Sequence, residues 1–216
     1  LAGPSTSVLL VSDHGNVTNR FGASISMRLL ETGLAVKNGK GRIDRKKSLA
    51  YPNDLVSTWI TVNAKPGTAR YEQVQDKVID AILSWKTSNG KRAIAAALKK
   101  KDSHLLGYYG KECGDVTFHY NSGFTWACGK NPAKSLMPAQ GGANHGPQMP
   151  VTFYGISDNL SFYVLKGPAF RKGERHADEK NGFINLVDIV PTICHAAGIT
   201  TPKDTTGTVR YGLFKA

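Results

Sequence analysis

Runs of apolar and β-branched residues along the chain predict several strands. Ser7–Val11 is an apolar run that lies between a Gly-Pro turn and Asp13-His14-Gly15, and we expect a buried strand at the edge of a parallel sheet. Four further segments rich in β-branched and aromatic residues are predicted strands: 58–62, 115–120, 149–156 and 160–165.

Helical periodicity marks other segments. The most regular pattern begins at Tyr71, where apolar residues recur three and four positions apart until about Trp85. A short helix is predicted within residues 22–35 and is ended by Gly33. An Ala-rich stretch with a basic end predicts another helix over residues 93–101.

The last predicted helix has Asp188 as its N-cap and stops at Gly198. Alternating strands and helices favour an α/β fold. We expect residues 1–36 and 129–216 to form a core and residues 37–128 to form an inserted, cap-like α+β region.

Length and composition fit a folded domain. The 216 residues are 40% hydrophobic, which suits one compact domain or part of a larger one. No apolar stretch reaches the roughly 20 residues that span a bilayer, so no membrane span is expected. The chain starts at Leu1 without Met or a signal-peptide pattern, and we expect its true beginning to lie upstream.

The charge is strongly basic, with 28 Lys and Arg against 16 Asp and Glu and a formal net charge of +12. A basic module that binds nucleic acid or an anionic surface is therefore one hypothesis. It is not favoured, because the clusters at 37–47 and 99–101 fall in a predicted loop and at a predicted helix end. The sequence also has no nucleic-acid-binding motif.

Three cysteines exclude a fully paired disulfide framework and a zinc ribbon. Cys113 and Cys128 could form one disulfide across a loop, and this alternative stays open. Cys194 lies in an apolar helical pattern and is predicted to be a small buried residue.

Two of the six histidines stand out by their context. His14 and His145 each occupy a Gly-flanked turn beside a predicted strand, where α/β proteins commonly build sites. Asp13 adds a carboxylate beside His14, and this pair of donors suits a divalent metal such as zinc. The other four are assigned to packed or surface positions: His104, His119, His176 and His195.

The order of several motifs resembles the C-terminal half of the alkaline phosphatase superfamily. The matching segments are Ser12-Asp13-His14-Gly15, Asn144-His145-Gly146, Met149–Gly155, Lys166–Phe170 and Asn185–Thr192. The sequence is most similar to the branch of type I phosphodiesterases and nucleotide pyrophosphatases.

This resemblance implies an alkaline-phosphatase-like core sheet flanked by helices, and a hydrolase that acts on a phosphoester or nucleotide-like substrate. Two divalent ions, most commonly zinc, would flank a Ser or Thr nucleophile. Asp13 and His14 would bind the ion beside the nucleophile, and His145 would bind the ion that prepares water. Asp188 is interpreted as a helix cap rather than as a further ligand.

The family places its nucleophile and half of its metal ligands before the segment that matches Ser7–Gly15, where only six residues stand here. No catalytic residue is therefore assigned within this chain. We expect the C-terminal part of a longer enzyme, inactive alone, with an apolar edge that the N-terminal half or another chain covers.

Alternatives within the superfamily are a phosphomonoesterase, a phosphomutase or a sulfatase, and a degenerate member that only binds ligands stays open. The compartment cannot be read from the residues, although the family resemblance suggests an exported or periplasmic protein.

Overall fold

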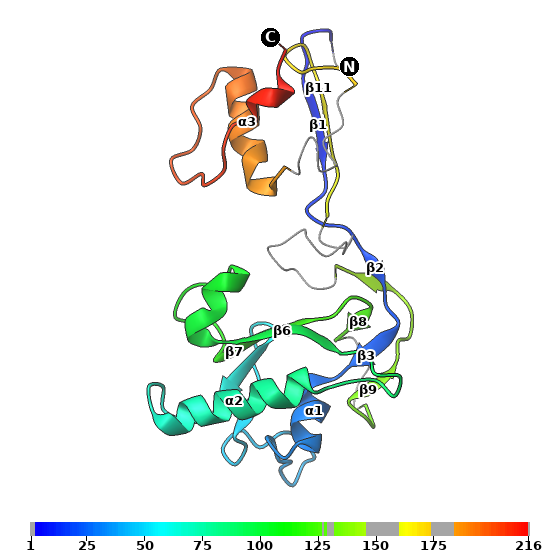
Figure 1. Ribbon diagram of the computed structural model, residues 1–216, viewed down its shortest axis with the longest axis vertical. Coiled ribbons are helices and arrows are strands. Elements are labelled where there is room, and N and C mark those ends of the chain that lie inside the picture. The colour runs from blue at the N-terminus through cyan, green and yellow to red at the C-terminus, as the bar shows by residue number, and fades with distance from the viewer. Residues whose placement is uncertain (1–2, 127, 129–131, 146–159, 174–183, 216) are drawn as a thin grey trace. The chain divides into compact units, whose positions relative to one another are not determined.

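The computed structural model describes residues 3–126, 128, 132–145, 160–173 and 184–215 (Figure 1). The chain forms two compact units. We call Leu1–Asp13 with Ser161–Ala216 the ribbon unit, and His14–Leu160 the sheet unit. The predicted boundaries after residues 36 and 128 both fall within the sheet unit, and the inserted cap stays a prediction.

The sheet unit holds most of the regular structure. Its described elements are β2 (Val17–Thr18), β3 (Phe21–Ala23), α1 (Ile25–Glu31), β4 (Ala50–Pro52), β5 (Trp59–Val62), α2 (Ala69–Leu83), β6 (Ile94–Lys99), the 3-10 helix η1 (Lys100–Leu106), β7 (Val116–Tyr120), β8 (Phe124–Thr125), β9 (Leu136–Pro138) and β10 (Ala143–Asn144). Four strands form the main sheet in the order β4-β5-β7-β6, and smaller sheets have the orders β8-β3-β9 and β10-β2. The predicted mixed α/β character is confirmed.

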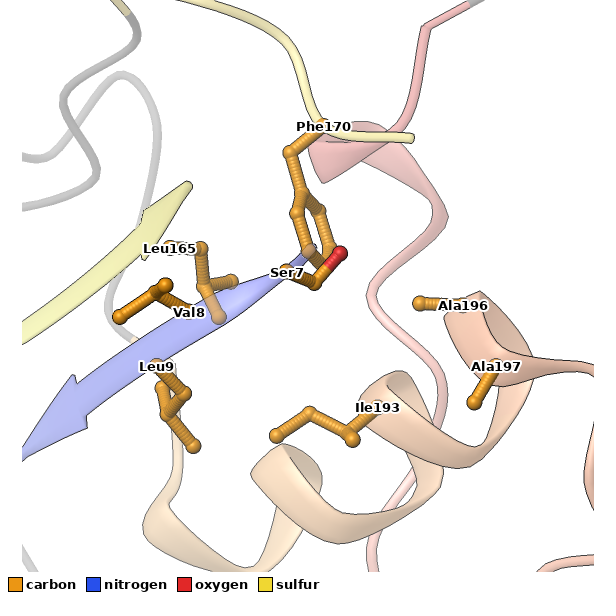
Figure 2. Close-up of a pocket in the computed structure, with 8 residues that line it drawn as sticks. All are labelled: Ser7, Val8, Leu9, Leu165, Phe170, Ile193, Ala196 and Ala197. Atoms are coloured by element: carbon orange, nitrogen blue, oxygen red, sulfur yellow. The ribbon is translucent and has the colours of Figure 1, made fainter. Parts of the chain in front are cut away.

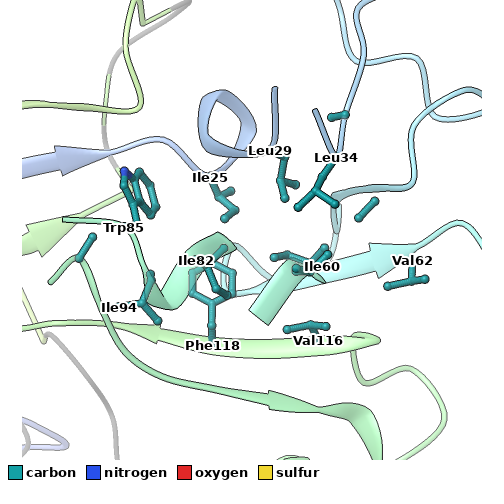
Figure 3. Packing of buried hydrophobic residues seen from close by; sticks show 14 of the residues in the cluster. Ile25, Leu29, Leu34, Ile60, Val62, Ile82, Trp85, Ile94, Val116 and Phe118 are labelled. Atoms are coloured by element: carbon teal, nitrogen blue, oxygen red, sulfur yellow. The ribbon is translucent and has the colours of Figure 1, made fainter. Parts of the chain in front are cut away.

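Helix α2 confirms the most regular periodicity in the sequence. Thr68 caps it by accepting a hydrogen bond from the backbone N–H of Tyr71. Its apolar face, with Val78 and Ile82 fully buried, packs with α1 and with the inner residues of the main sheet (Figure 3). The resulting core is continuous, so this unit buries the apolar face of its main sheet within itself.

The prediction of a helix at residues 93–101 is wrong, because this segment forms strand β6 and the start of η1. Alanine favours helices, but β6 pairs antiparallel with β7 from Ile94↔Tyr120 to Lys99↔Val116. The hydrogen bonds of this pairing override the local preference of a short Ala-rich stretch.

The ribbon unit contains β1 (Val8–Val11), β11 (Tyr163–Lys166), the 3-10 helices η3 (Leu186–Asp188) and η4 (Tyr211–Leu213), and α3 (Ile189–Ala197). The expectation of a buried, parallel β1 is wrong on both points. Strand β1 pairs antiparallel with β11, and Val8, Leu10 and Val164 are exposed. One side of the ribbon faces α3, whereas no described residue of this unit covers the other.

An apolar pocket of about 100 Å³ lies between the ribbon and α3 (Figure 2). Leu9, Leu165 and Phe170 line it from the ribbon side, and Ile193 lines it from the helix.

Asp188 stands at the N-terminus of α3 as predicted, but its side chain makes no capping hydrogen bond to that helix. Instead it caps η3, where its carboxylate accepts a hydrogen bond from the backbone N–H of Asn185. The same carboxylate accepts hydrogen bonds from Thr208 and Arg210. Gly198 ends α3 with φ 66°, as predicted. The helices that the structure describes include none that is long and apolar enough to cross a membrane.

Candidate functional site

Two strands of the sheet unit bring His14 and His145 together. Strand β2 begins three residues after His14, and it pairs antiparallel with β10, which ends immediately before His145. Asn144 also donates a hydrogen bond to the carbonyl of Phe124, which ties the end of β10 to β8. The two imidazole rings lie 4.9 Å apart between centroids, at an interplanar angle of 63°.

A hydrogen bond orients the ring of His14. Its Nδ1 lies 2.7 Å from the carbonyl oxygen of Gly15, and because a carbonyl only accepts, Nδ1 carries the proton. In the neutral ring, Nε2 then carries the lone pair. Metal-binding histidines use this arrangement, with one nitrogen held by a carbonyl and the other facing the ion.

Asp13 directly precedes His14 and is the last residue of the first segment of the ribbon unit. Its carboxylate and the two imidazoles are donors that suit zinc. Among the described residues, no group of three or more His, Cys, Asp or Glu side chains is gathered at one metal position. The assignment of Asp13, His14 and His145 as metal ligands therefore stays a prediction, which the closeness of the two imidazoles supports.

An aromatic row continues from the two imidazoles. The ring of His145 lies 6.0 Å from that of Trp126, and Trp126 lies 6.4 Å from Tyr120. Tyr120 is buried, and its hydroxyl donates to the carbonyl of Ala23. Sequence reasoning missed Trp126; a Trp placed among Gly, Ser and Asn residues was the available signal.

His119 lies on β7, inside the strand predicted for it, and stacks on Tyr108. Burial lowers its pKa to about 4, with a further lowering from the charge of His145. At neutral pH it is therefore an uncharged ring. Its Nε2, the Oγ1 of Thr117 and the Nε1 of Trp59 are buried without a hydrogen-bond partner in the described part of the chain.

The remaining histidines take no part in this row or lie outside the described residues. His104 is exposed on η1, and His195 packs against Tyr211 and Phe214 in the ribbon unit. His176 and the predicted strand 149–156 lie outside the described residues. All three cysteines are free thiols, and Cys194 is buried as predicted.

Comparison with known proteins identifies a fold. The chain is similar to the crystal structure of alkaline phosphatase PafA, with a TM-score of 0.51 and 13% sequence identity. The match covers 97% of this chain and 38% of PafA. No protein-family model and no curated protein matches the sequence. The alkaline-phosphatase-like fold class is thereby confirmed, whereas the branch suggested by the motifs stays a prediction.

Proposed function

We propose that this chain is the C-terminal part of a metal-dependent phosphoester hydrolase of the phosphodiesterase or nucleotide pyrophosphatase type. The observation that carries the proposal is the meeting of His14 and His145, which lie far apart in the sequence, within a fold similar to that of a phosphatase. Neither observation alone would distinguish a pair of metal-binding histidines in a hydrolase from a pair of histidines with a purely structural role.

Three residues of this chain would hold divalent ions. Asp13 and His14 would supply a carboxylate oxygen and Nε2 to one ion, and His145 would supply a nitrogen to a second. Bound zinc would supply positive charge that stabilises phosphate oxygens and lowers the pKa of a bound hydroxyl or water. The bond from His14 Nδ1 to Gly15 keeps the ring oriented and its other nitrogen available as a donor.

The nucleophile is proposed to be a Ser or Thr that precedes this chain in the full polypeptide. The reaction would proceed by attack of that hydroxyl on the phosphorus atom, with loss of the alcohol or phosphate leaving group, and water would then hydrolyse the phosphoenzyme. The excess of basic residues would favour approach of anionic substrates.

The test measures hydrolysis by the full polypeptide with and without zinc after treatment with EDTA. We expect zinc-dependent cleavage of bis-p-nitrophenyl phosphate that exceeds cleavage of p-nitrophenyl phosphate and p-nitrophenyl sulfate. Asp13→Ala, His14→Ala and His145→Ala should each lower kcat/KM by at least about 100-fold. His104→Ala removes an exposed imidazole of the same unit and is the matched control.

Preference for the monoester would favour a phosphomonoesterase, and preference for the sulfate ester would favour a sulfatase. Full activity in the three alanine variants, or activity that resists EDTA, would contradict the proposal.

A further inference from the structure

A hairpin at residues 36–47 of the sheet unit carries a dense group of cations, and we call it the basic hairpin. Its two arms pair antiparallel at Lys37↔Ile43, and the backbone N–H of Asp44 donates to the carbonyl of Val36. The segment contains six Lys or Arg residues and one acidic residue. All six cations are exposed: Lys37, Lys40, Arg42, Arg45, Lys46 and Lys47.

Ion pairs neutralise little of this charge. Among the described residues, only Arg45 of the hairpin has an acidic partner, Asp54, at 2.5 Å between Nη2 and Oδ1. The one carboxylate of the hairpin, on Asp44, accepts hydrogen bonds from the backbone N–H groups of Lys46 and Lys47. The other five cations have no ion-pair partner in the part of the chain that the structure describes, so their charge is available to an external partner.

Hydrogen bonds hold the backbone of the basic hairpin in place. The side-chain amide oxygen of Asn38 accepts hydrogen bonds from two backbone N–H groups across the tip. Near the base, the side chain of Asn63 donates to the carbonyls of Arg45 and Lys46. Leu34, two residues before the hairpin, is buried in the core of the sheet unit. The cations are therefore presented by an ordered scaffold.

Two exposed apolar side chains accompany these cations. Val36, at the base of the hairpin, is 40% exposed, and Leu55 is 68% exposed. Leu55 directly follows Asp54, the partner of Arg45, and therefore lies next to the hairpin. Its backbone N–H donates to Oδ1 of Asn53 at 2.7 Å, which orders the turn that presents the side chain. Cations and a large apolar side chain thus share one corner of the sheet unit.

This combination fits the surface of an anionic lipid bilayer. Lys and Arg side chains near such a surface are attracted to its negative head groups. An apolar side chain beside them leaves water when it enters the boundary between head groups and acyl chains. A nucleic acid would also attract the cations, but its phosphate backbone has no apolar layer that would receive Leu55. The basic hairpin itself has no aromatic residue on which bases could stack, and the observations therefore favour a bilayer.

We propose that the basic hairpin and Leu55 form a docking surface for membranes that contain anionic phospholipids. The contact is peripheral: the cations lie over the head groups, and Leu55 enters the interface. This inference goes beyond the proposed function and does not depend on it, because none of these residues belongs to the proposed metal site.

The test is sedimentation of the full polypeptide with lipid vesicles of two compositions. Vesicles of phosphatidylcholine alone carry no net charge, whereas vesicles with about one third phosphatidylglycerol are anionic. We expect binding to the anionic vesicles to be at least about 10-fold stronger than binding to the neutral ones. Binding should weaken steeply as the ionic strength rises from about 0.1 M to about 0.5 M, because salt screens the attraction.

Two variants locate the contact. The triple variant Lys40→Gln, Lys46→Gln and Lys47→Gln should lower the partition coefficient for anionic vesicles by roughly 100-fold, since each cation near the surface contributes about fivefold. Leu55→Ser should lower it by about 3- to 10-fold, because it removes the side chain that enters the interface. Thermal unfolding of each variant shows whether the fold is kept.

A matched control removes the same charge elsewhere in the sheet unit. The triple variant Lys77→Gln, Lys86→Gln and Lys111→Gln replaces three exposed lysines outside the hairpin. It should change vesicle binding by less than about threefold, because the attraction falls off within a Debye length of the surface. Hydrolysis of bis-p-nitrophenyl phosphate, a soluble substrate, should stay within about twofold of the unsubstituted protein in all variants.

Equal binding to neutral and anionic vesicles, equal losses in the two triple variants, or no loss in Leu55→Ser would overturn this inference. Binding of a single-stranded oligonucleotide that needs the lysines of the hairpin, without binding to vesicles, would overturn it in favour of a nucleic-acid partner. Hydrolysis of the soluble ester without vesicle binding refutes only the docking surface. Vesicle binding without hydrolysis refutes the proposed function and leaves the docking surface supported.

Discussion

The two units bury their apolar residues to different extents. In the sheet unit, Ile60, Val78 and Phe118 are fully buried in one core that both helices and the main sheet share. In the ribbon unit, Val8, Leu10 and Val164 are exposed along one side of a two-stranded ribbon. A two-stranded ribbon is only marginally stable in water unless further strands or a helix pack on its apolar faces. We therefore expect the sheet unit to be stable by its own packing and the ribbon unit to depend on further contacts.

Replacing one Phe by Ala in each unit should give the largest difference in the free energy of unfolding. Phe118→Ala removes a ring that is fully buried and packs edge-on against Tyr120, at 5.2 Å between ring centroids. We expect a loss of about 3–5 kcal/mol in the free energy of unfolding of the sheet unit. Phe162→Ala, at an exposed position of the ribbon unit, should cost less than about 1 kcal/mol. Urea unfolding would measure both, and equal losses would contradict the contrast.

The ribbon unit should instead depend on a polar anchor, the carboxylate of Asp188. It accepts hydrogen bonds from the backbone N–H of Thr208 at 2.9 Å and from Nε of Arg210 at 2.7 Å. Asp188→Asn leaves the guanidinium of Arg210 without its charged partner and should destabilise this unit by roughly 2–4 kcal/mol at neutral pH. Protection of its backbone amides from hydrogen exchange measures the loss, and Asp204→Asn, at an exposed position of the same tail, is the control.

The effect of Asp188→Asn should depend on pH. Burial raises the pKa of Asp188, but hydrogen bonds from Thr208 and the charge of Arg210 outweigh it, so the pKa lies below the ordinary 3.8. The stabilisation is therefore complete above about pH 4 and disappears as the pH falls through the lowered pKa. A difference between the variant and the unsubstituted protein that persists unchanged at pH 2 would contradict this account.

A smaller effect should follow from the unpartnered hydroxyl of Thr117 in the sheet unit. Thr117 is fully buried, and its Oγ1 has no hydrogen-bond partner among the described residues. Thr117→Val keeps the shape and removes the buried polar atom, so stability should stay the same or rise by up to about 1 kcal/mol. Thr117→Ser keeps the hydroxyl and removes a methyl group, and it should be destabilising. A clear loss in Thr117→Val would indicate that the hydroxyl has a partner.

The smallest effect on the stability of this chain should come from substitutions on the exposed side of the ribbon. Leu10→Thr and Val164→Thr change side chains that face solvent, so each should alter stability by less than about 0.5 kcal/mol. In the full polypeptide the same changes should cost clearly more if a preceding segment packs on this face. Equal, small effects in both would contradict the prediction that the ribbon needs a cover.

Local sequence patterns correctly predicted the elements whose conformation is determined by their own residues. The spacing of Val74, Val78 and Ile82 predicted α2, and the left-handed glycine at 198 predicted the end of α3. The segment 93–101 could not be predicted in this way, because its conformation depends on pairing with β7, a strand about twenty residues away. The exposure of β1 likewise depends on what packs against it, which its own apolar sequence does not reveal.

The candidate site was only partly readable from the sequence. Gly-flanked turns singled out His14 and His145, and the pairing of β2 with β10 explains why they meet. Trp126 was missed because a single Trp in a turn-rich segment has no periodic pattern, and its position beside His145 arises only from the fold. Asp188 was correctly placed at a helix start, but its bonds to Thr208 and Arg210 join residues about twenty positions apart.

The most direct test of the central hypothesis is an anomalous difference map at the zinc absorption edge, from crystals of the full polypeptide grown with zinc. The account predicts one peak within bonding distance of Asp13 and His14 Nε2, and a second beside a ring nitrogen of His145. A map without peaks at these side chains would contradict the metal assignment and the proposed function that rests on it.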